Sequence, residues 1–98
     1  MLPRIKNIIA VEPFKVKCEW TNGEIRTIDF ALLQKEMGDN FSAKILKPHI
    51  FNAVKLDAIA KTLYWENELP YTDYDGETKL GALDFCPDVL FSHSILAA

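Results

Sequence analysis

The stretch "CEWTNGEIRTIDF", residues 18–30, decides the expected fold because it reads as a complete β-hairpin. Its centre, Asn22-Gly23, is the strongest short signal for a tight hairpin turn, since a type I′ turn needs positive φ angles, which Asn and Gly tolerate best. Residues equidistant from this turn should face each other across the two strands. Trp20 is then expected opposite Ile25 on the core face, and Glu19 opposite Arg26 on the solvent face.

The strand before the turn, "FKVKCEW" at residues 14–20, alternates apolar and polar side chains without interruption. This alternation is typical of a half-buried strand. The expected inward residues are Phe14, Val16, Cys18 and Trp20, and the expected outward residues are Lys15, Lys17 and Glu19. The hairpin is therefore interpreted as scaffold, with one face in the core and the other in solvent.

Short segments on either side of the hairpin predict the remaining elements. Residues 5–11 suit a strand, and "ALLQKEMG" predicts a short helix that Asp29 caps and Gly38 ends. Pro48 opens a brief second helix, residues 52–56 and 61–65 predict a second hairpin, and Pro87 begins one or two further helical turns. We therefore expect a single domain over residues 1–98 of the α+β class, with a small, mainly antiparallel sheet of two hairpins and two or three short helices.

The net charge of -3 hides an uneven distribution of charged residues along the chain. Residues 1–61 hold ten Lys and Arg against seven Asp and Glu, whereas residues 62–98 hold one, Lys79, against seven. The acidic end repels nucleic acid phosphates, and the lysines of the basic half alternate with apolar residues instead of clustering. No direct nucleic-acid partner is therefore expected.

The composition is that of an ordinary globular protein, with 49% hydrophobic and 26% charged residues. The apolar runs are far too short to span a bilayer, and the N-terminus lacks an apolar stretch of signal-peptide length. We expect no membrane partner and a cytoplasmic location. Cys18 and Cys86 form no CxxC pair, so they are interpreted as reduced and mostly buried thiols, and neither a zinc knuckle nor a disulfide framework is expected.

Two groups of polar residues superficially resemble reactive sites, but their spacing argues against both. Asp73, Asp75, Gly76 and Glu77 lack the alternate ligand positions of a calcium loop. Ser92, His93 and Ser94 are sequence neighbours, which seldom point at each other as a nucleophile and its base must.

Other titratable residues give no stronger indication of chemistry. Asp84 and Asp88 lie at helical spacing, but no neighbouring residue implies the raised pKa that acid–base catalysis needs. His49 is far in sequence from His93, the other histidine. We therefore assign no catalytic, cofactor-binding or metal-binding residue, and we expect no cofactor and no enzyme activity.

The aromatic and acidic residues of segment 68–81 are the candidate partner-binding residues. Exposed tyrosines offer large amphipathic contact areas, and interleaved carboxylates suit a basic protein partner. The candidates are Tyr71, Asp73, Tyr74, Asp75 and Glu77. The competing interpretation is a solubilising flap, an exposed excursion with a tight turn at Asp75-Gly76 that packs Tyr71 on the domain.

An ordered set of short segments runs through nearly the whole chain. It comprises Arg4-Ile5-Lys6, residues 14–20, Asn22-Gly23-Glu24-Ile25-Arg26, Asp29-Phe30, Ile50-Phe51, Ala53-Val54-Lys55-Leu56, Tyr64-Trp65, Ala82-Leu83-Asp84 and Pro87-Asp88-Val89-Leu90-Phe91. In this order the chain resembles a small bacterial family of uncharacterised domains catalogued as DUF 2442, from which it departs by an insertion near residues 68–81. The resemblance implies a small α+β domain without established enzyme activity, and some members of the family look like one half of a toxin–antitoxin pair.

Two functions from different classes remain open at this point. The first is a non-enzymatic protein-interaction domain that is antitoxin-like or accessory to a small protein. Assembly of this domain into a homo-oligomer also remains open. The second is a small-ligand or metal-binding domain, or a minor enzyme, that uses the carboxylates of residues 66–88. A bound metal or ligand among Asp73, Asp75, Glu77 and Asp84 would favour the second function.

Overall fold

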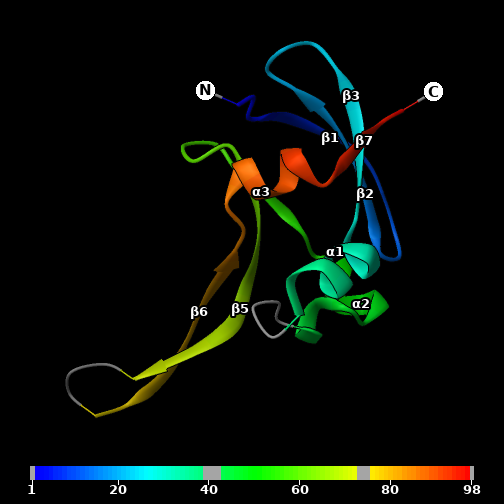
Figure 1. Cartoon of the computed structure of the whole chain (residues 1–98). Helices are drawn as coiled ribbons and strands as arrows, with labels where there is room; N and C mark the ends of the chain where they lie inside the picture. Colours follow the sequence, from blue (N-terminus) through cyan, green and yellow to red (C-terminus); the bar gives the residue numbers. More distant parts are fainter. Residues whose placement is uncertain (1, 39–42, 73–75, 98) are drawn as a thin grey trace.

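The computed structural model describes residues 2–38, 43–72 and 76–97, with the backbone alone at residues 43, 67–72 and 78–80. It contains two antiparallel sheets and several short helices, so the predicted α+β class is confirmed. One long hairpin extends well away from the rest of the chain (Figure 1), and the molecule measures 48 × 26 × 22 Å along its principal axes. In the described part of the chain, no helix is both long and apolar enough to cross a membrane.

The larger sheet has four strands in the order β1-β2-β3-β7. They are β1 (Ile5–Glu12), β2 (Lys15–Trp20), β3 (Ile25–Asp29) and β7 (Ser94–Leu96). The predicted alternation along β2 is confirmed, because Val16, Cys18 and Trp20 are buried while Lys15 and Lys17 are exposed. Helix α1 (Phe30–Met37) follows β3, helix α3 (Pro87–Ser92) precedes β7, and both add buried leucines to the core on the inner face of this sheet.

The smaller sheet has three strands in the order β4-β5-β6. They are β4 (Lys55–Asp57), β5 (Thr62–Thr72) and β6 (Thr78–Asp84), preceded by the 3-10 turn η2 (Ala43–Ile45) and helix α2 (Pro48–Phe51). The predicted second hairpin is therefore present as β4 and the start of β5. Asp57 closes its turn, because Asp57 Oδ1 accepts hydrogen bonds from the backbone N–H groups of Ile59 (2.9 Å) and Ala60 (3.0 Å).

An aromatic cluster fills the core between the two sheets. The Phe30 ring lies 5.4 Å, centroid to centroid, from Phe51, Trp65 and Phe85, in edge-to-face geometry each time. The indole Nε1 of Trp65 donates to the backbone carbonyl of Phe51 at 3.2 Å, so this buried polar atom has a partner. The cluster fixes the base of β5 and β6 against α1 and α2.

The predicted register of the first hairpin is wrong by one residue. Glu19 faces Ile25, and Cys18 faces Arg26. The N–H of Gly23 donates to the carbonyl of Trp20 (2.9 Å), and the N–H of Trp20 donates to the carbonyl of Glu24 (2.9 Å), which leaves three residues in the loop.

The loop conformation explains this difference. Gly23 has a φ of +88° whereas Asn22 does not have a positive φ, so the loop is a turn followed by a glycine bulge and not the expected type I′ turn. Asn22 Oδ1 accepts a hydrogen bond from the N–H of Glu24 (3.0 Å), which stabilises this alternative. The extra loop residue moves Arg26 from the predicted solvent face to the inner face of β3.

The predicted helix ends are confirmed. Asp29 Oδ1 accepts a hydrogen bond from the N–H of Leu32 (3.1 Å) at the start of α1, and Gly38 ends the helix with a φ of +57°. Pro48 occupies the first turn of α2, and Pro87 occupies the first turn of α3.

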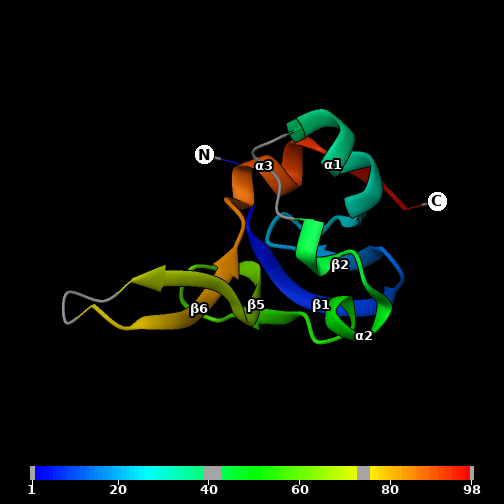
Figure 2. The same cartoon turned by 90° about the horizontal axis from the view of Figure 1, so that it is seen from below.

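Two features of the C-terminal half differ from expectation. The stretch expected as an exposed excursion, residues 66–81, contains more regular structure than expected, since it continues β5 to Thr72 and supplies most of β6. We call residues 66–82, the hairpin beyond the Trp65 and Leu83 pair, the arm, and Figure 2 shows that its two strands project from the body. Strand β7 was not expected, because its pairing with β3 depends on a contact between residues far apart in sequence.

Candidate functional site

Two arginines attach the C-terminal segment to the larger sheet. Arg4 forms an ion pair with Asp88 in the first turn of α3. The Arg26 guanidinium lies 4.5 Å from the centroid of the Phe91 ring, and its Nε donates to Ser94 Oγ at 2.6 Å. Its Nη2 also donates to the Ser94 carbonyl at 3.0 Å, so Arg26 binds the end of α3 and the start of β7 together.

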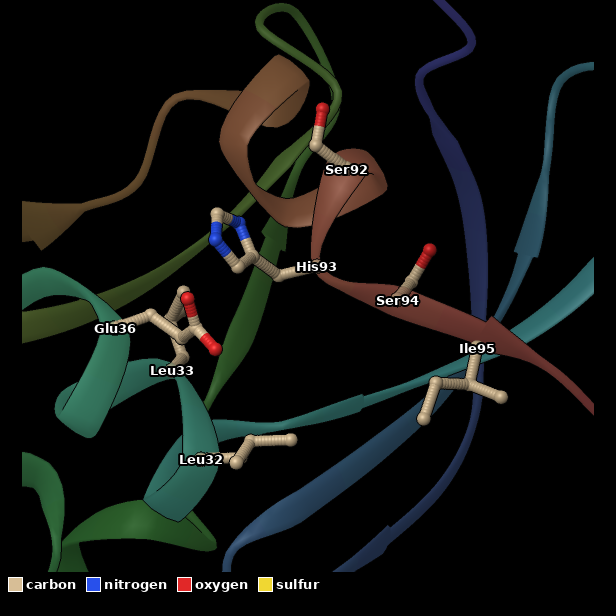
Figure 3. Close-up of a pocket in the computed structure, with 7 residues that line it drawn as sticks. All are labelled: Leu32, Leu33, Glu36, Ser92, His93, Ser94 and Ile95. Atoms are coloured by element: carbon tan, nitrogen blue, oxygen red, sulfur yellow. The ribbon is translucent and has the colours of Figure 1, made fainter.

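This attachment creates a groove between α1 and the α3–β7 connection, with a volume of about 400 Å³ (Figure 3). Its lining residues are Leu32, Leu33, Glu36, Ser92, His93, Ser94 and Ile95. Two of these are unusually exposed for large apolar side chains, since Leu32 is 46% and Ile95 is 63% accessible. The groove therefore has an apolar wall that water contacts directly.

The polar side of the groove is formed by His93 and Glu36, whose side chains point toward one another in Figure 3. His93 Nδ1 lies 2.9 Å from the carbonyl oxygen of Val89, which can only accept, so neutral His93 carries its proton on Nδ1 and its lone pair on Nε2. Ser94 Oγ donates to the carbonyl of Phe91 (2.6 Å) while accepting from Arg26. These two hydrogen bonds fix the Ser94 hydroxyl between Phe91 and Arg26. The Ser92 side chain points away from the His93 ring (Figure 3).

The sequence patterns did not predict this groove. One signal was present, because "ALLQKEM" carries more apolar surface than a single helix face can bury and so predicts that one leucine remains outside the core. The opposite wall could not be inferred, since Ile95 is placed beside α1 only by the unexpected strand β7.

The candidate partner-binding residues all belong to the segment that connects or forms the ends of β5 and β6. The backbone of Tyr71 pairs with Lys79 across the arm, and Glu77 is exposed just before β6 begins. Asp73, Tyr74 and Asp75 lie outside the described residues, as does the side chain of Tyr71. The proposed turn at Asp75-Gly76 therefore stays a prediction.

The arm is strongly acidic by sequence and is open along much of its length. Residues 66–81 hold five Asp and Glu against one Lys. Strand β4 pairs with β5 only from Thr62 to Tyr64, and β6 is the outer strand of its sheet. At the base of the arm, Glu66 pairs with Lys55 at 3.1 Å, and this hydrogen-bonded contact raises the pKa of Lys55.

The cysteines and acidic residues show no arrangement that suggests metal binding in the described ranges, where no three His, Cys, Asp or Glu side chains lie close enough to share an ion. Burial raises the pKa of the Cys18 thiol to about 12, so this group stays neutral and unreactive. Cys86 is exposed, in contrast to the expectation that both thiols are buried.

Comparison with protein-family models, curated proteins and solved structures found no match for this chain. The resemblance to DUF 2442 therefore stays a prediction based on the order of short segments.

Proposed function

We propose that the chain is a non-enzymatic protein-interaction domain that docks a basic protein partner on its arm. The observation that carries this proposal is the arm itself, a two-stranded hairpin that leaves the body of the domain (Figures 1 and 2). A two-stranded hairpin in water is marginally stable by itself, and three or more strands or a covering element are needed for independent stability. A partner that covers the arm would supply the further strand or covering element that stabilises such a hairpin.

The charge of the arm indicates the kind of partner. Four net negative charges in residues 66–81 attract a basic surface from a distance and oppose acidic ones. The candidate contact residues remain Tyr71, Asp73, Tyr74, Asp75 and Glu77. The physiological role that we propose, an antitoxin-like or accessory partner of a small protein, rests on the resemblance alone.

The test begins by capturing the partner from source cells with immobilised protein and purifying it. Association kinetics are then measured by stopped flow for the native chain and for Asp73→Ser, Asp75→Ser, Glu77→Ser combined. We expect the association rate constant to fall about tenfold at low salt, because the variant loses three charges that steer the partner. Its salt dependence should flatten, because salt screens such charges within about 10 Å at 0.1 M. The melting temperature should hardly change, since exposed charges contribute little to stability.

The matched control removes the same number of charges elsewhere, by Glu12→Ser, Glu19→Ser and Glu36→Ser combined. These carboxylates lie outside the arm, so association should keep at least half of its rate. If the control slows association as much as the arm variant does, net charge and not the arm governs binding. If only the control slows it, the partner binds the larger sheet or the groove.

A second candidate function, the binding of a small ligand, is favoured by the groove beside His93. Its volume of about 400 Å³ lies within the range of about 300–1,000 Å³ that ligand pockets occupy. A fragment screen by amide chemical shifts checks it: a groove ligand should shift Leu33, His93 and Ile95 together, and hits confined to other residues would count against it.

A further inference from the structure

We propose that the outer edge of β6 accepts an extended, basic segment of the partner protein as an additional strand. This inference rests on the proposed function and deepens it, because it names the binding mode and the conformation of the occupant. Both sheets expose edge strands, and an unpaired edge offers a row of backbone donors and acceptors to another chain.

Most of the described edge strands are poor templates for a further strand. Strand β1 has register shifts at two places, between Ile5 and Asn7 and between Ile8 and Ala10, and such bulges disrupt pairing. Strands β4 and β7 have only three residues each. Strand β6 has seven residues and no proline, and the register shift opposite it lies in β5, between Trp65 and Leu69.

Backbone geometry shows which amides of β6 face outward. The N–H of Phe85, next after β6, donates to the carbonyl of Leu63 on β5 at 3.4 Å. Successive N–H groups along a strand point to opposite sides, so the N–H of Leu83 points toward β5 and the N–H groups of Ala82 and Leu80 point away from it.

The other side of the arm is less suited to strand addition. Pro70 of β5 pairs with Leu80, whose N–H points outward, so the nitrogen of Pro70 also lies on the unpaired side of its strand. A strand added along β5 would find no N–H donor there. Of the two sides of the arm, the β6 edge is therefore the one that offers an uninterrupted row of backbone groups.

The charge of the arm selects the occupant. A second copy that added its own β6 would bring together two arms that each carry four net negative charges, and like charges across strands are destabilising. Exposed Glu77 and Asp84 mark the two ends of the edge. An extended segment with Lys or Arg at alternate positions complements both the backbone row and these carboxylates.

The test uses a nine-residue capped peptide that alternates Lys with Thr as the probe, and a fully N-methylated peptide of the same sequence and charge as its counterpart. Binding is followed by amide chemical shifts and by hydrogen exchange of the full-length protein. We expect the plain peptide to slow hydrogen exchange at Ala82. The N-methylated peptide should bind at least tenfold more weakly, because several backbone hydrogen bonds are lost.

A variant of the protein tests the same edge from the other side. Ala82→Pro removes an outward N–H while leaving the bonds between β5 and β6 intact, and we expect it to weaken peptide binding about tenfold. Ala82→Val keeps the N–H and is the matched control, with unchanged affinity. Exchange protection of the Leu83 amide reports whether the hydrogen bonds between β5 and β6 survive the substitution. If they do not, the comparison of the plain and N-methylated peptides on the unmodified protein remains the test.

Three results would overturn strand addition: no binding of the plain peptide, equal binding of both peptides, or full affinity of Ala82→Pro. If both peptides bind equally, but their affinity still falls with added salt and in the triple serine variant, the proposed function stands as docking by charge alone. Loss of salt dependence and of any effect of the triple variant would instead remove the proposed function itself.

Discussion

Arg26 shows how much one residue can depend on the loop beside it. Its side chain is only 17% exposed and contacts Glu24, Phe91 and Ser94, although the hairpin pattern predicts a solvent-facing residue. It joins β3 to the C-terminal segment through charge-assisted hydrogen bonds, which are stronger than neutral ones.

We expect Arg26→Ala to lower the free energy of unfolding by about 2–3 kcal/mol, since it removes a cation–π contact and leaves Ser94 Oγ without its donor. Lys17→Ala, an exposed change on the neighbouring strand, is the control and should cost less than about 0.5 kcal/mol. Urea denaturation measures both. A loss below about 1 kcal/mol for Arg26→Ala would mean that the C-terminal segment stays attached without it.

Cys18 gives a prediction for pH. Burial raises its pKa from 9.0 to about 12, so above pH 9 the folded thiol keeps a proton that the unfolded thiol loses. Its contribution to stability is therefore complete below pH 9 and falls as the pH rises from about 9 to about 12.

The Cys18→Ala variant should consequently lose less stability than the native chain between pH 8 and pH 10.5. Denaturant melts at the two pH values measure this difference, and lysine or tyrosine titration cancels in the comparison. Parallel pH curves for the two proteins would contradict the assigned burial.

In native protein, a thiol reagent should modify exposed Cys86 and leave Cys18 unmodified until unfolding.

At the scale of single elements, α1 depends on its cap. Asp29→Ala should cost about 1 kcal/mol, because the N–H of Leu32 loses its acceptor, and Asp29→Ser should recover most of that loss. Thermal or urea unfolding of the three proteins checks the order. Equal stability of the alanine and serine variants would show that the cap contributes through charge and not through the hydrogen bond.

At the scale of the whole molecule, the core and the arm are separate parts. The described core residues of the long hairpin, Leu63, Trp65 and Phe85, all lie at its base. The N–H of Ile5 donates to the carbonyl of Lys61 at 3.0 Å, so β1 is bonded to the turn of the smaller sheet.

Replacing residues 67–81 by a short Asn-Gly turn should therefore change the free energy of unfolding by less than about 1 kcal/mol. Trp65→Ala, in contrast, should cost about 3–5 kcal/mol because it opens a cavity among three aromatic rings. Denaturant melts of the two variants test this separation. An unfolded truncated chain would show that the arm stabilises the domain and would favour a structural role for it.

Local patterns in the sequence determined much of this protein. Alternation placed Val16, Cys18 and Trp20 inside, and Asp29, Gly38 and Pro48 marked helix ends, because these features depend on neighbours within a few residues. Even the acidic charge of the arm is a property of composition.

Only the tertiary structure decided the register, the arm and the groove. Asn22-Gly23 is compatible with a two-residue turn and with a three-residue loop that ends in a glycine bulge. The loop that forms lets Arg26 reach Phe91 and Ser94, residues almost seventy positions away. Strand β7 is too short to be recognised by itself and exists because β3 offers it an edge. Such long-range pairings carry no signature in a short window of sequence, since their free energy comes from contacts that form only after the chain has folded.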